Sequence, residues 1–115
     1  MYLTLKDRII ILNTVLPRFD TRKNIELMKS IKGKLALSDT ENSVVVATSA
    51  GNNQFDISFK TADAVTKEDE FVFSGEEMEY LKRRVEFIDS NGMFSEETIS
   101  TYDKLLNDGD NTEGQ

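Results

Sequence analysis

Two capped, amphipathic segments near the C-terminus constrain the fold more than any other part of the chain. Ser74 precedes Glu77 by three residues, the spacing at which each side chain bonds the other residue's backbone amide and starts a helix. Apolar residues then recur at steps of three and four, and a second run of this kind follows Ser95. Gly92 lies between the two runs, where glycine readily adopts the left-handed conformation that ends a helix. The pattern predicts a helical hairpin over residues 75–106.

The N-terminal segment predicts another helix, over residues 5–15, with Thr4 as its N-cap. The β-branched residues over 9–12 also fit a strand, which stays open as an alternative. The helix carries more apolar residues than one buried face accommodates. Its surplus apolar residues form a candidate surface for a protein partner or a second copy of the chain: Ile10, Ile11 and Val15.

The next predicted helix, over residues 22–32, begins at Thr21 and has a strongly basic polar side. A face of this kind is normally only solvated, but clustered basic residues also bind nucleic-acid phosphates. The chain has no glycine-rich phosphate loop, no aromatic RNA-binding signature and no zinc-finger spacing. The candidate basic patch consists of Arg18, Arg22, Lys23, Lys29, Lys32 and Lys34.

The middle of the chain predicts strands. After a brief helical turn around 39–43, residues 44–48 and 54–60 favour a hairpin that turns at Ser49–Asn53. Residues 70–73 are a candidate third strand. We therefore expect an α+β fold in which about four helices pack on a small two- or three-stranded antiparallel sheet, with the helical hairpin at the C-terminal end.

Length predicts a single domain over residues 1–108. The polar segment 109–115 is expected to form a disordered tail, with Gly109 ending the last helix. No apolar run approaches the roughly 20 residues that cross a bilayer, and no secretory signal is apparent, so we expect a cytoplasmic protein.

Residue types limit the chemistry, because the 115 residues include no histidine and no cysteine. Disulfides, thiolate metal sites and the side chain most used for proton transfer are therefore excluded. A partial match to a calcium loop fails: with Gly92 at loop position 6, Phe87 and Thr98 occupy the positions that require carboxylates. We expect no metal, no cofactor and no enzymatic activity.

Charge is unevenly distributed along the chain. Residues 1–35 contain eight Lys/Arg and three Asp/Glu, a net charge of +5, whereas residues 36–115 contain six and eighteen, a net charge of −12. The two parts can attract each other within the fold, or the basic part can serve as a docking surface for an acidic partner.

The segment Phe71–Glu77, continued to Leu105, resembles small uncharacterised proteins of phages and integrated elements. Those proteins also have a hydrophobic lead-in, a capped helix, a glycine turn and a second capped helix, and the opening Leu3–Ile9 is similar to their first helix. The resemblance covers about half of the chain and implies an accessory protein of a phage or mobile element, without implying active residues.

The sequence thus favours a small acidic protein that acts by binding another protein, in the simplest version through a homodimer formed by the first helix. Association with nucleic acid through the basic patch is the alternative. A carboxylate-dependent hydrolase is third, for which no pair of acidic residues stands out.

Overall fold

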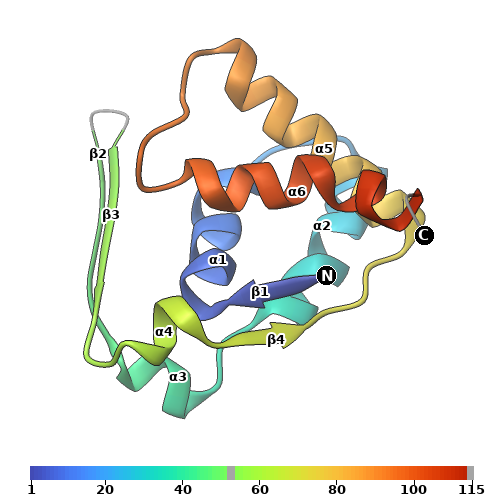
Figure 1. Ribbon diagram of the computed structural model, residues 1–115. Helices are drawn as coiled ribbons and strands as arrows, with labels where there is room; N and C mark the ends of the chain where they lie inside the picture. Colours follow the sequence, from blue (N-terminus) through green and yellow to red (C-terminus); the bar gives the residue numbers. More distant parts are fainter. Residues whose placement is uncertain (52–53, 114–115) are drawn as a thin grey trace.

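The computed structural model describes residues 1–51 and 54–113 and confirms the α+β class. Two small antiparallel sheets accompany a set of helices (Figure 1). No helix within the described ranges combines the length and the apolar composition that a bilayer span requires. The elements in order are β1 (Tyr2–Thr4), α1 (Leu5–Ile10), the π-helix η1 (Ile11–Val15), α2 (Arg22–Leu35), α3 (Asp39–Ser43), β2 (Val45–Gly51), β3 (Gln54–Phe59), α4 (Asp63–Thr66), β4 (Glu68–Glu70), α5 (Gly75–Ser90) and α6 (Ile99–Glu113).

The helical hairpin at the C-terminal end is confirmed. The Ser74 hydroxyl accepts a bond from the Glu77 amide, and the Glu77 carboxylate accepts one from the Ser74 amide, so α5 begins with the predicted capping box. Helix α6 returns alongside α5 (Figure 1). It begins at Ile99 rather than directly after Ser95, because residues 95–98 form a turn in which Ser95 and Thr98 bond each other.

The end of α6 differs from the prediction. The helix continues past Gly109 to Glu113, since a glycine inside a helix costs only about 1 kcal/mol relative to alanine and does not by itself stop it. Residues 114–115 lie outside the described residues, and the division into a domain over 1–108 and a disordered tail stays a prediction.

The first helix is confirmed, and the strand alternative over residues 9–12 is wrong. Thr4 and Asp7 form a capping box at the start of α1. The helix then widens to a π-helix, in which the Leu16 amide bonds the Ile11 carbonyl five residues back. Two side chains take carbonyls of the preceding turn: Asn13 Nδ2 bonds Ile9 O at 2.8 Å, and Thr14 Oγ1 bonds Ile10 O at 2.7 Å. These side-chain donors keep both carbonyls hydrogen-bonded where the π-helix departs from the regular α-helical pattern.

The strands form two sheets rather than one. Strands β2 and β3 make the predicted hairpin, of which residues 52–53 of the predicted turn lie outside the described part. Of the predicted two- or three-stranded sheet, the two-stranded form is confirmed. The candidate third strand over 70–73 does not join β2 and β3, because β4 pairs with β1, opposing Glu70 to Tyr2 and Glu68 to Thr4. Strand β1 is too short to show a periodicity in sequence. Its Leu3 side chain is fully buried, and Thr4 is buried as well.

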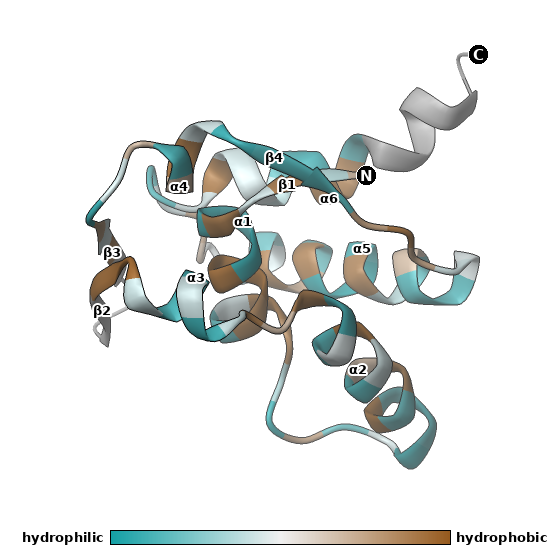
Figure 2. Cartoon of the chain, turned by 90° about the horizontal axis from the view of Figure 1, so that it is seen from below, coloured by the Kyte–Doolittle hydropathy of each residue, from teal (hydrophilic) through white to brown (hydrophobic). Residues whose placement is uncertain are grey.

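The core lies among α1, η1, α2, α5 and α6. Figure 2 shows hydrophobic and hydrophilic residues alternating along α5, as expected of a helix with one buried face. The predicted partner surface on the first helix is wrong, because the rest of this chain buries all three residues of that surface. The exposed fraction is 0% for each of Ile10, Ile11 and Val15.

Replacing each of two glycines by alanine should change the free energy of unfolding in opposite directions. Gly92 has a φ of +64°, where an alanine is strained, whereas a Cβ added to Gly33 within α2 meets nothing within 4 Å. We expect Gly92→Ala to lower the free energy of unfolding by about 1 kcal/mol. We expect Gly33→Ala to raise it by about 0.4 to 1 kcal/mol. Urea unfolding followed by circular dichroism measures both, and equal shifts would contradict the assigned turn.

Candidate functional site

The six residues of the basic patch are all exposed, but the structure divides them. Lys23 and Lys34 are eleven residues apart and share one flank of α2, since eleven residues complete about three helical turns. This flank faces the start of α5. Lys34 Nζ lies 2.6 Å from Glu77 Oε1, and Lys23 Nζ lies 3.8 Å from Glu76 Oε2. These two lysines thus neutralise acidic residues of the same chain.

A groove of about 460 Å³ runs between this flank and α5. Both signs of charge line it, and its acidic side includes Glu77, which is buried. Burial by itself raises the pKa of Glu77, but hydrogen bonds from Lys34, Ser30 and the Ser74 amide outweigh it and lower the pKa to about 2. Glu77 is therefore an ionised structural group. Two lysines and three glutamates line the groove, and both lysines pair with a glutamate of α5, so the described lining of the groove offers no unpaired cation to an anionic ligand.

The other four basic residues remain open to solvent. Arg22 and Lys29 are seven residues apart, about two helical turns, and Lys32 lies one turn further along this second flank. Arg18 precedes the helix. Within residues 1–51 and 54–113, none of the four nitrogen-bearing side chains lies within 4.0 Å of a carboxylate oxygen, in contrast to Lys23 and Lys34.

The connection between η1 and α2, residues 16–21, presents a large aromatic side chain to solvent. We call it the Phe19 loop, because the exposed fraction of Phe19 is 87%, the highest among the exposed large hydrophobic residues of the described chain. Pro17 restricts the backbone near its start. The signal for this loop in the sequence is an aromatic residue between Arg18 and Asp20 in the short connection between two predicted helices.

Hydrogen bonds to Asp20 attach the loop both to the start of α2 and to α5. Asp20 Oδ1 accepts bonds from the Thr21 amide at 2.7 Å and Asn24 Nδ2 at 2.9 Å, and Asp20 Oδ2 accepts one from Tyr80 OH at 2.9 Å. The bonds from Asn24 and Thr21 lower the pKa of Asp20. Burial and the bond to Asp20 raise the pKa of Tyr80 to about 12. The acceptor is thus ionised and the donor protonated at neutral pH, which keeps the loop attached to α5.

A second contact braces the beginning of the loop. Arg84 Nε donates to the Val15 carbonyl at 3.1 Å, and the Arg84 guanidinium lies 4.9 Å from the centre of the Phe87 ring. Phe87 is itself 54% exposed. Arginine and aromatic side chains therefore meet on the part of α5 that supports the loop.

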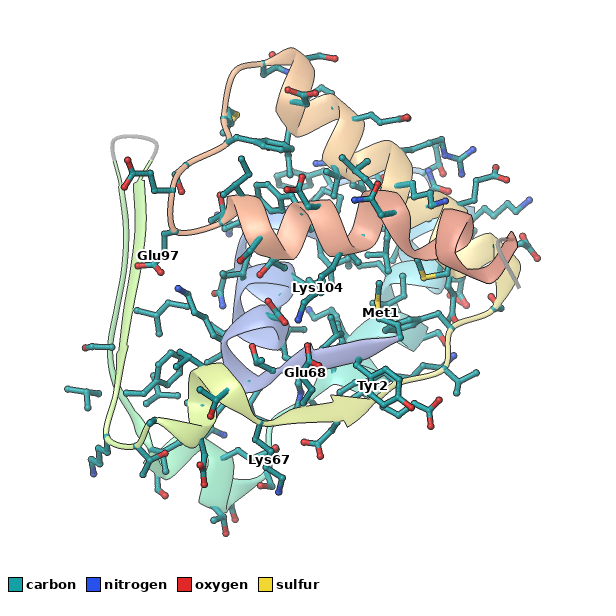
Figure 3. All side chains as sticks on the ribbon, in the orientation of Figure 1. Met1, Tyr2, Lys67, Glu68, Glu97 and Lys104 are labelled. Atoms are coloured by element: carbon teal, nitrogen blue, oxygen red, sulfur yellow. The ribbon has the colours of Figure 1, made fainter. Side chains whose placement is uncertain are left out.

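The buried charged residues have structural roles. Burial by itself raises the pKa of Asp7, but bonds from Lys104, Thr101 and the Thr4 amide outweigh it, and the pKa is lowered. Lys104 Nζ also bonds Glu68 at 2.6 Å, so one lysine of α6 joins α1 to β4 (Figure 3). A carboxylate with a lowered pKa is a poor general acid near neutral pH.

The segment around Gly92 that partly matches a calcium loop forms a turn at the end of a helix. Gly92 closes the turn after α5, and its amide bonds the Asp89 carbonyl at 2.9 Å. Among the described residues, no three Asp or Glu side chains gather in a way that could hold a metal ion.

Comparison with protein-family models, with curated proteins and with solved structures finds no match to this chain.

Proposed function

We propose that the chain is a non-catalytic domain that acts by binding another protein, and that the Phe19 loop makes the central contact. The observation that carries this proposal is a phenylalanine that is 87% exposed on a loop held by hydrogen bonds. Exposing an aromatic ring of this size to water is unfavourable by roughly 2 kcal/mol relative to burying it. A partner with an apolar pocket would recover that free energy.

Composition and rigidity support this assignment. Aromatic and arginine side chains are enriched at the centres of protein interfaces, and Arg18 and Arg22 flank Phe19 closely in sequence. A loop that is already ordered loses little conformational entropy on binding. The chemistry that complements the loop is an apolar pocket bordered by carboxylates.

Site-specific photocrosslinking tests the proposal. We expect benzoylphenylalanine placed at Phe19 to give a discrete protein adduct in cells of the native host. The same group at Val72, which is 74% exposed and lies between β4 and α5, is the matched control and should give none. The adduct at position 19 should disappear when Arg18→Glu and Arg22→Glu are added. Adducts of equal yield at both positions, or none at position 19, would contradict the proposal.

Nucleic acid is the second candidate partner, because Arg22, Lys29 and Lys32 share an open flank of α2. Fluorescence anisotropy with a labelled DNA duplex tests it: binding at low salt that weakens steeply as salt rises would favour this candidate. The net charge of −7 opposes such binding at long range.

Two further ideas stay predictions. The hydrolase has no carboxylate with a raised pKa to support it among the groups described above. The accessory role in a phage or mobile element rests on the resemblance of the C-terminal hairpin alone.

A further inference from the structure

We infer that the partner of the Phe19 loop is a second copy of this chain, whose pocket between α1, α3 and α4 receives the Phe19 ring. This inference rests on the proposed function and names its partner. The loop presents a protruding ring next to arginines, and the pocket is a hollow with an acidic rim. The two surfaces lie on different sides of the molecule.

The receiving pocket has an apolar floor. Leu5 of α1, Val44 after α3 and Ala64 of α4 line it, and Ala64 is almost fully buried. Its volume is about 290 Å³, at the lower limit of roughly 300 Å³ for small-molecule sites. A pocket of this size suits a single aromatic ring better than a larger ligand.

The rim of the pocket is acidic. Asp63 and Asp69 are exposed on it, and Glu41 also lines it, although Arg8 of the same chain holds the Glu41 carboxylate. Lys67 contributes one opposing charge. A ring inserted with Arg18 and Arg22 beside it would bring two cations and one carboxylate, Asp20, to this rim. Thr21, Asn24 and Tyr80 donate to Asp20, and the remaining net charge of +1 favours contact with the acidic rim.

The positions of the two surfaces decide the kind of assembly. Figure 2 places α2 and the loop before it on the lower side of the molecule, whereas α4 and β4 lie on the upper side. A contact between different surfaces of two copies is head-to-tail and leaves one loop and one pocket unused. Further copies can therefore add, and the assembly does not stop at a dimer unless it closes into a ring.

Sedimentation equilibrium of the full chain over a wide concentration range tests the inference. We expect the average mass to rise beyond two chains with concentration and to fall as salt is added. Phe19→Ala should weaken association roughly thirtyfold or more, as for the central residue of an interface. Val72→Ala, the matched exposed control, should leave it unchanged.

Charge variants of the pocket give a second readout. Asp63→Lys with Asp69→Lys should abolish association, whereas Glu86→Lys with Asp89→Lys, an equal charge change on exposed residues of α5, should retain it. Lys67→Glu should strengthen association, a gain that a misfolded variant cannot give. Mixing the Phe19→Ala chain with the Asp63→Lys, Asp69→Lys chain should restore a single complex of two chains, since one supplies the pocket and the other the loop.

The outcomes separate the two proposals. A wild-type chain that stays monomeric while benzoylphenylalanine at position 19 captures a different protein would overturn self-association and leave protein binding in place. Association that Phe19→Ala does not weaken, or a mixture that forms no two-chain complex, would also overturn it. Loss of every adduct at position 19 would instead remove the proposed function.

Discussion

Replacing Arg8 by methionine should lower the free energy of unfolding by about 3 kcal/mol, a large share of the roughly 5 to 15 kcal/mol of a typical domain. The exposed fraction of Arg8 is 5%, and its guanidinium bonds both Glu41 oxygens, at 2.5 and 3.2 Å. It also donates to the Leu35 and Ala36 carbonyls at the end of α2. Methionine fills similar space but leaves these acceptors without their donor.

The bonds from Arg8 also lower the pKa of Glu41, so the variant should return that pKa toward its ordinary value. Urea unfolding at pH 7 measures the stability, with Arg22→Met as the control because Arg22 is exposed on α2. The control should change stability by no more than about 0.5 kcal/mol. Equal losses in the two variants would show that arginine itself, rather than its buried contacts, matters.

Acid should destabilise the fold in a narrow pH range. Glu77 has a pKa of about 2 in the folded chain against an ordinary value of 4.5, and the pKa of Asp7 is lowered as well. The unfolded chain therefore takes up protons first as pH falls. The resulting stabilisation is complete above about pH 5.5 and is lost as pH falls from about 4.5 toward 2. For Glu77 alone it amounts to roughly 3 kcal/mol.

Unfolding by urea at a series of pH values checks this expectation. Glu77→Gln should lower stability at pH 7 and flatten the decline below pH 5, because the group with the lowered pKa is gone. Glu76→Gln is the control, since the neighbouring Glu76 side chain is 70% exposed. Parallel pH profiles for the wild type and Glu77→Gln would contradict the role assigned to Glu77.

The helix starts were predictable from sequence, because a capping box joins two residues that are only three positions apart. The spacing of Ser74 and Glu77, and of Thr4 and Asp7, is visible in the sequence and reappears as hydrogen bonds. The pairing of β1 with β4 was not predictable, because it joins segments 66 residues apart and each strand has only three residues. The π-helix was also missed, since the apolar pattern of 5–15 does not distinguish the width of a helical turn.

The candidate site was predicted only in part. Arg18 and Arg22 belonged to the basic patch, but Phe19 did not enter it, because an exposed and a buried phenylalanine look the same in sequence. The excess of apolar residues in the first helix predicts an exposed surface, but the tertiary fold buries Ile10, Ile11 and Val15. The pocket lined by Leu5, Val44 and Ala64 combines three distant segments, so only the folded chain brings it together.

The β1–β4 ladder and the contacts of Asp7 with Thr101 and Lys104 connect the earliest residues to some of the last. During synthesis on a ribosome, the partners of Asp7 therefore emerge 94 and 97 residues after it. Until α6 has left the exit tunnel, α2 and α5 can cover the first helices only in part, because Tyr102 and Leu105 of the shared core are still absent. We therefore expect the packing of α1 to be completed only after α6 has emerged.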